Sequence, residues 1–166
     1  MTDQPNDDRP RYEDDFYAWT QFQAEVLRAI PVSDNRFDRD HLVEEIEDLG
    51  KSERNAVRSE IRRILEHLLK LAYSPAAYPR ADWMVSIANA RAELEDHLTA
   101  SLRRDAEASL PVLYERARDA AAIALRAHGE QEAEATLPTR CPFTFDEVLQ
   151  RGWYPEPHRP LEDGGA

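Results

Sequence analysis

The sequence predicts an all-α protein, a compact helical bundle of about five longer helices and one short C-terminal helix. Glycine is scarce, with 5 residues in 166, and charged residues make up 33% of the chain. No run of β-branched residues alternates with polar ones, as it does in a strand. Apolar residues instead recur every three to four positions, the spacing of a buried helix face. A chain of this length hides roughly 70% of its unfolded surface, so it needs no disulfide or metal to hold a core.

The first three helices are predicted before Pro75. The first runs from Asp14 to Ile30 and stops at Pro31, which cannot continue it. The second runs from Asp38 to Leu49 and ends at Gly50, a residue suited to a left-handed cap; its inward side chains are Leu42, Val43, Ile46 and Leu49. The third starts at Ser52 and should lie at the centre of the protein, because it has the longest apolar stripe: Val57, Ile61, Ile64, Leu65, Leu68 and Ala72.

The remaining helices follow a proline-containing loop. The fourth starts at Asp82 and ends within residues 99–105, with Trp83, Ile87, Ala90, Leu94 and Leu98 inward. The fifth starts near Ser109, has Pro111 in its first turn and ends at His128 before Gly129. Residues 130–141 are predicted to be irregular. Thr144 and Glu147 then form a capping box for the short last helix, after which Trp153 folds back.

The helices form a single domain over residues 12–153, between disordered ends at residues 1–11 and 154–166. The longest apolar run, Ala120 to Leu125, is far shorter than the roughly 20 residues that span a bilayer. The N-terminus lacks the basic start and apolar core of a signal peptide. A single cysteine, Cys141, makes no internal disulfide, as is typical of a reducing compartment. The sequence therefore predicts a cytoplasmic protein without a membrane partner.

The charge predicts which partners the protein has. The chain carries 21 basic and 33 acidic residues, a formal net charge of −12, so it repels phosphate backbones and nucleic acid is excluded as a partner. Val112 and Ile123 point away from the inner face of the fifth helix, and a small bundle gains by covering such apolar residues. We therefore expect a protein partner or self-association, in the form of a homodimer.

Several kinds of chemistry lack their motifs. The chain has no Gly-x-Ser-x-Gly elbow, no Gly-x-Gly-x-x-Gly and no Walker loop, and no histidine follows a glutamate at the Glu-x-x-His spacing of di-iron bundles. Cys141, between Arg140 and Pro142, is predicted to be a small buried apolar group rather than a nucleophile. No cofactor is predicted, and the catalytic residues of any enzyme activity are unknown from this sequence.

One set of residues fits a metal site. His41 and Glu45 are one helical turn apart, as are Glu93 and His97, and antiparallel helices would place both pairs at a similar height. Two histidines and two carboxylates suit zinc or a similar ion. His67 lies too far along its helix to join them. The alternative interpretation, which we favour, is that these are solvated helix edges.

A further prediction concerns the acidic second helix. Across the turn at Gly50, Glu45 would pair with Arg54 and Arg58, an arrangement that needs no catalytic role for the carboxylates.

The sequence resembles the bacterial domain-of-unknown-function family number 29. The motifs that carry the resemblance are Tyr12-Glu-Asp-Asp-Phe-Tyr-Ala-Trp19, Leu42-Val-Glu-Glu-Ile-Glu-Asp-Leu-Gly-Lys-Ser-Glu-Arg54, His67-Leu-Leu-Lys70, Trp83 with Ile87, and Cys141-Pro-Phe143. The resemblance implies a compact helical fold and no established activity. Leu71 stands where similar proteins usually have tryptophan and Ser74 where they tend to have glutamine, and residues 130–136 are altered. These differences leave the predicted fold unchanged.

Two hypotheses for function remain open. The favoured one is a non-enzymatic helical interaction or adaptor protein that acts through its surface. The alternative is a metal-binding protein or metal-dependent enzyme that uses His41, Glu45, Glu93 and His97. The sequence leaves open whether the protein is an enzyme.

Overall fold

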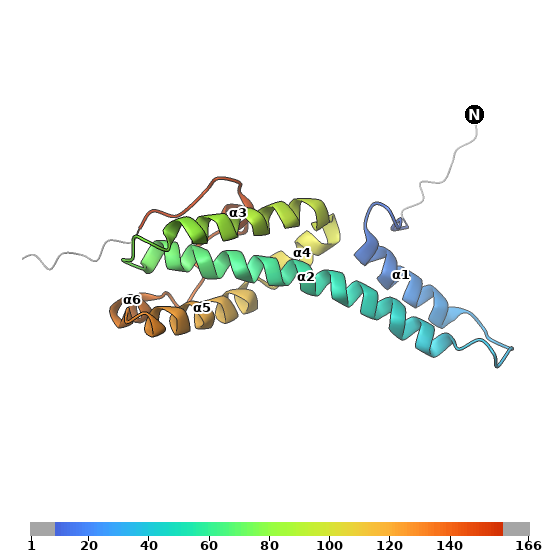
Figure 1. Ribbon diagram of the computed structural model, residues 1–166. Helices are drawn as coiled ribbons and strands as arrows, with labels where there is room; N and C mark the ends of the chain where they lie inside the picture. Colours follow the sequence, from blue (N-terminus) through green and yellow to red (C-terminus); the bar gives the residue numbers. More distant parts are fainter. Residues whose placement is uncertain (1–8, 158–166) are drawn as a thin grey trace, which may run out of the picture. The chain divides into compact units, whose positions relative to one another are not determined.

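The structure, a computed structural model, describes residues 9–157, and these form helices and connecting segments without a strand (Figure 1). The helices are α1 (Phe16–Ala29), α2 (Arg39–Tyr73), α3 (Arg80–His97), α4 (Ala100–Ala108), α5 (Leu110–Ala127), α6 (Gln131–Thr136) and α7 (Phe145–Leu149). The predicted all-α class is confirmed. The disordered ends predicted at residues 1–11 and 154–166 lie mostly outside the described residues.

The chain forms two compact units. Unit 1 holds the described residues up to Val57 together with Leu98–Asp105, and unit 2 holds Arg58–His97 and the described residues from Ala106 onward. Helix α2 contributes its first half to unit 1 and its second half to unit 2. The single domain expected over residues 12–153 stays a prediction.

The turn predicted at Gly50 is wrong, because α2 continues through it without a break. Gly50 is buried in unit 1, and the glycines with a positive φ among the described residues are Gly129 and Gly152. A Cβ atom at Gly50 would lie 2.2 Å from Thr20 Oγ1 on α1. Glycine therefore stands here because two helices approach closely, not because a helix ends.

Two further predictions fail with that turn. Glu45 and Arg54 lie on one continuous helix, about 13 Å apart along its axis, so they cannot pair across a hairpin. Arg58 instead donates to Ser109 Oγ at 2.7 Å. Leu42 and Leu49, expected to point inward, are 43% and 53% exposed, because the buried face of this part of α2 runs through Val43, Gly50 and Val57.

Asp15, at the start of α1, links α1 to the start of α4 within unit 1. Its carboxylate accepts hydrogen bonds from the Ala18 backbone, the Ser101 backbone and the Ser101 hydroxyl, at 3.0, 3.0 and 2.6 Å. Partial burial raises the pKa of Asp15, but these hydrogen bonds outweigh it and hold the pKa below its ordinary value. The rings of Tyr12, Phe16 and Trp19 pack beside it with centroids 5.0–5.9 Å apart. The first family motif thus joins α1 to the start of α4.

Unit 2 is built around the second half of α2, which α3 and α5 flank (Figure 1). The predicted stripe is confirmed: its six side chains are at most 6% exposed, and Leu69 and Leu71 are buried with them. Helix α2 ends at Tyr73, two residues before Pro75 as expected. Within residues 9–157, every helix is too short or too polar to cross a membrane.

Residues 9–157 contain five longer helices, as predicted, but these are not the five that were expected. The predicted second and third helices are one helix, and Ala100–Ala108 forms a separate helix where the end of the fourth was expected. Thr99 starts this helix by accepting a hydrogen bond from the Leu102 backbone at 3.4 Å. The segment predicted to be irregular contains α6. The capping box of Thr144 and Glu147 is confirmed.

Candidate functional site

A buried arginine joins α3 to the C-terminal segment of unit 2. Arg91 is 3% exposed, and its guanidinium donates to the carbonyl oxygens of Val148, Trp153 and Glu147 at 2.9, 2.8 and 3.0 Å. Its Cζ lies 5.6 Å from the ring centroid of Tyr154, within cation–π range. Because all its contacts are internal, Arg91 is a structural group: it satisfies the carbonyls at the end of α7 and fixes the folded-back Trp153.

Arg91 was not predicted as a functional or structural residue, although its position carries a signal. Arg91 lies four residues after Ile87 and three before Leu94, which places it on the inner face of α3. A charged residue at an inner position is buried only if it finds partners. The last carbonyls of a short helix are such partners.

The motif His67-Leu-Leu-Lys70 gives unit 2 a second group of buried polar side chains. Lys70 is 8% exposed, its Nζ atom lies 2.7 Å from Glu66 Oε1, and it sits 5.7 Å from the ring centroid of Trp83. His67 Nδ1 is buried without a hydrogen-bond partner among the described residues. Burial lowers the pKa of His67 to about 4, and the charge of Lys70 adds to the lowering.

His67 should therefore make stability depend on pH. Between the ordinary histidine pKa of 6.5 and about 4, the unfolded chain binds a proton at this position that the folded chain does not. The free energy of unfolding should fall as the pH drops through this range, and a His67→Leu variant should show a shallower decline in urea unfolding measured from pH 7 to pH 4.

His41 provides the control for this experiment. Its Nδ1 atom lies 2.6 Å from Asp38 Oδ2, and this hydrogen bond raises the pKa of His41 above 6.5. In an NMR titration, the pKa of His41 should lie above 6.5 and the pKa of His67 below it. Asp38→Asn should lower the pKa of His41 and leave His67 unchanged. A His67 that titrates near 6.5 in the folded protein would contradict the prediction.

The residues of the predicted metal site are divided between the units. His41 and Glu45 lie in the first turns of the α2 segment of unit 1, and Glu93 and His97 lie near the end of α3 in unit 2; all four side chains are exposed. The two pairs were expected at a similar height because antiparallel helices were assumed on either side of Gly50. Helix α2 is continuous there, so this basis for the site is lost. Across residues 9–157, no three or more His, Cys, Asp or Glu side chains are grouped so that they could hold a metal ion. The four-residue site stays a prediction, and metal analysis of purified protein is its direct test.

Cys141 is half-buried, and its Sγ atom donates to the Phe143 carbonyl at 3.3 Å. Burial raises the pKa of its thiol, which keeps it protonated at neutral pH. This environment agrees with the predicted apolar role rather than with a nucleophile.

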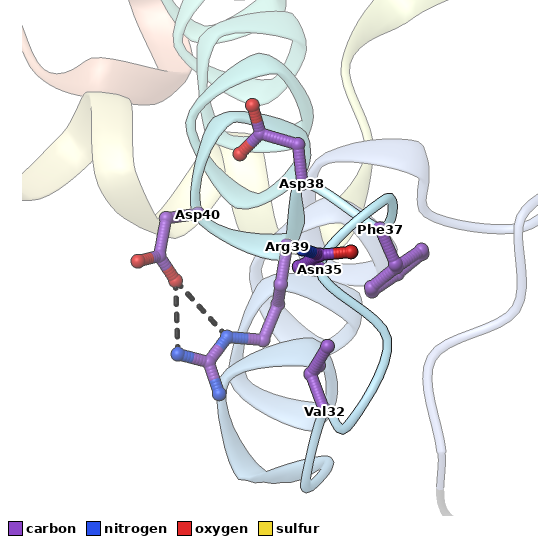
Figure 2. Close-up of a pocket in the computed structure, with 6 residues that line it drawn as sticks. All are labelled: Val32, Asn35, Phe37, Asp38, Arg39 and Asp40. Carbon is purple, nitrogen blue, oxygen red and sulfur yellow. Dashed lines mark hydrogen bonds and ion pairs between the residues drawn. The ribbon is translucent and has the colours of Figure 1, made fainter.

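An open hollow of about 340 Å³ lies where the loop before α2 meets the start of this helix (Figure 2). Its lining residues are Val32, Asn35, Phe37, Asp38, Arg39 and Asp40. The charged side chains among them are already paired: Arg39 with Asp40 at 2.9 Å, and Asp38 with His41. The hollow therefore offers a ligand no unpaired charge and no buried catalytic group.

Exposed apolar side chains gather on the hairpin formed by α1 and the Arg39–Val57 part of α2. Val26, Ile30, Leu42 and Leu49 are 37–53% exposed, and we call these four residues the hairpin face. On α5, the exposed Val112 and Ile123 are separated on their own surface by Arg116 and Asp119, whereas on α2 a single charged residue, Glu45, lies between Leu42 and Leu49. Single apolar residues among charges are ordinary on a protein surface, whereas a contiguous patch is typical of an interaction site.

Comparison with known proteins places the chain in a family. The family model described as "Domain of unknown function DUF29" matches residues 11–154. A solved structure, that of an alpha-helical protein of unknown function from Rhodospirillum rubrum ATCC 11170, is 28% identical with a TM-score of 0.75, over 87% of this chain and 92% of that chain. No curated protein matches the sequence. The family model and the solved structure both carry descriptions of unknown function, and with most of its length matched, the chain belongs to the DUF29 family that its motifs predict.

Proposed function

We propose that this protein is a non-enzymatic helical interaction protein, an adaptor that binds a protein partner through the hairpin face. The observation that supports this most directly is the position of the exposed apolar residues. Seven of the twelve large exposed apolar side chains of the described residues lie between Tyr12 and Leu49. An apolar patch of this kind costs solubility unless a partner covers it.

The charged groups near the patch support binding rather than catalysis. Arg28 pairs with Glu47 on the hairpin, Arg39 pairs with Asp40, and Lys51 pairs with Asp48 at 2.7 Å. Each of these carboxylates is already held by a neighbouring cation rather than directed at a bound molecule. The surrounding chemistry therefore favours a surface that binds over a surface that reacts.

We further propose that the protein acts in the cytoplasm. The single cysteine and the acidic surface support this location, because a secreted helical domain of this size is more often stabilised by disulfides.

Site-specific photo-crosslinking in living bacteria tests the interaction even while the partner is unidentified. Leu49 and Val112 are both 53% exposed, which makes them a matched pair of positions. A photoreactive p-benzoylphenylalanine should form a defined protein adduct at position 49 and none at position 112. Leu42→Glu should reduce the yield at position 49, because it places a charge in the same patch.

The result that contradicts the proposal is equally clear. No adduct at position 49, or equal adducts at both positions, would show that the hairpin face is ordinary surface. The crosslink tests whether the hairpin face binds a protein, whichever protein the adduct contains.

A further inference from the structure

We draw no further inference here: the strongest candidate, the side-chain cluster of Glu66, His67 and Lys70 on α2 in unit 2, carries nothing beyond the pH dependence of stability already described, because Lys70 is paired with Glu66 and the Nδ1 atom of His67 is buried out of reach of a ligand.

Discussion

Arg91→Ala should lower the free energy of unfolding by about 3–5 kcal/mol, because each buried acceptor left without its donor costs about 1–3 kcal/mol. The variant takes away three hydrogen bonds to the carbonyls of residues 147, 148 and 153 and leaves those acceptors facing a cavity. The C-terminal segment should detach first. Hydrogen exchange should therefore show loss of protection in α7 before any loss in α5, and urea unfolding should give the total effect.

Two substitutions separate the hydrogen bonds from the charge. Arg91→Lys retains a positive charge, but one ammonium group cannot match the fork that reaches three carbonyls, so its cost should be intermediate. Arg151→Ala is the matched surface control: Arg151 is in the same segment and pairs with Glu95 at 3.1 Å, but its side chain is 74% exposed. Its loss should cost less than about 1 kcal/mol. Equal effects for Arg91→Ala and Arg151→Ala would disprove the structural role of Arg91.

The second half of α2 and the short α7 were predictable because each carries its signals locally. The stripe from Val57 to Ala72, the stop before Pro75 and the capping box at Thr144 all depend on neighbouring residues, and the structure agrees with each. Gly50 shows where this reasoning fails. A glycine after an apolar run indicates a helix end by local rules, but here the cause is a residue of another helix, Thr20, which sequence spacing does not reveal.

The turn wrongly predicted at Gly50 also affected the predicted metal site. With a turn at Gly50, Leu42 and Leu49 pointed inward and His41 came level with residues of the next helix. In the structure α2 is continuous, and Leu42 and Leu49 are exposed and form half of the hairpin face. The exposed pair on α5 was predicted correctly, since Val112 and Ile123 are 53% and 66% exposed. Charged residues, Arg116 and Asp119, lie between them on the same surface of α5.

Gly50→Ala should destabilise the protein by about 2 kcal/mol, although alanine is the better helix former. Helix propensity alone predicts a gain of about 1 kcal/mol for this change. The added methyl group, however, would lie 2.2 Å from Thr20 Oγ1 and 2.9 Å from Gln21 Nε2. Thr20 is fully buried and its hydroxyl donates to the Tyr17 carbonyl at 2.8 Å, so relieving the contact requires a new rotamer or a shift of α1. Overpacking typically costs about 1–3 kcal/mol, and a methyl carbon this close to a fully buried side chain puts the site at the upper end of that range. After the gain in helix propensity, a net loss of about 2 kcal/mol remains.

A double-mutant cycle identifies the cause. Thr20→Ala removes the hydroxyl oxygen, after which the closest remaining atom of residue 20 is its Cβ at 3.3 Å, so Gly50→Ala should cost at least 1 kcal/mol less in the Thr20→Ala background. Asn55→Ala, at an exposed position of the same helix, reports the effect of propensity alone and should be neutral or slightly stabilising. If Gly50→Ala stabilises the protein as Asn55→Ala does, α1 does not pack against α2 at this position. The hairpin face would then lose its geometric basis, because the arrangement of Val26 and Ile30 beside Leu42 and Leu49 depends on the contact between Thr20 and Gly50.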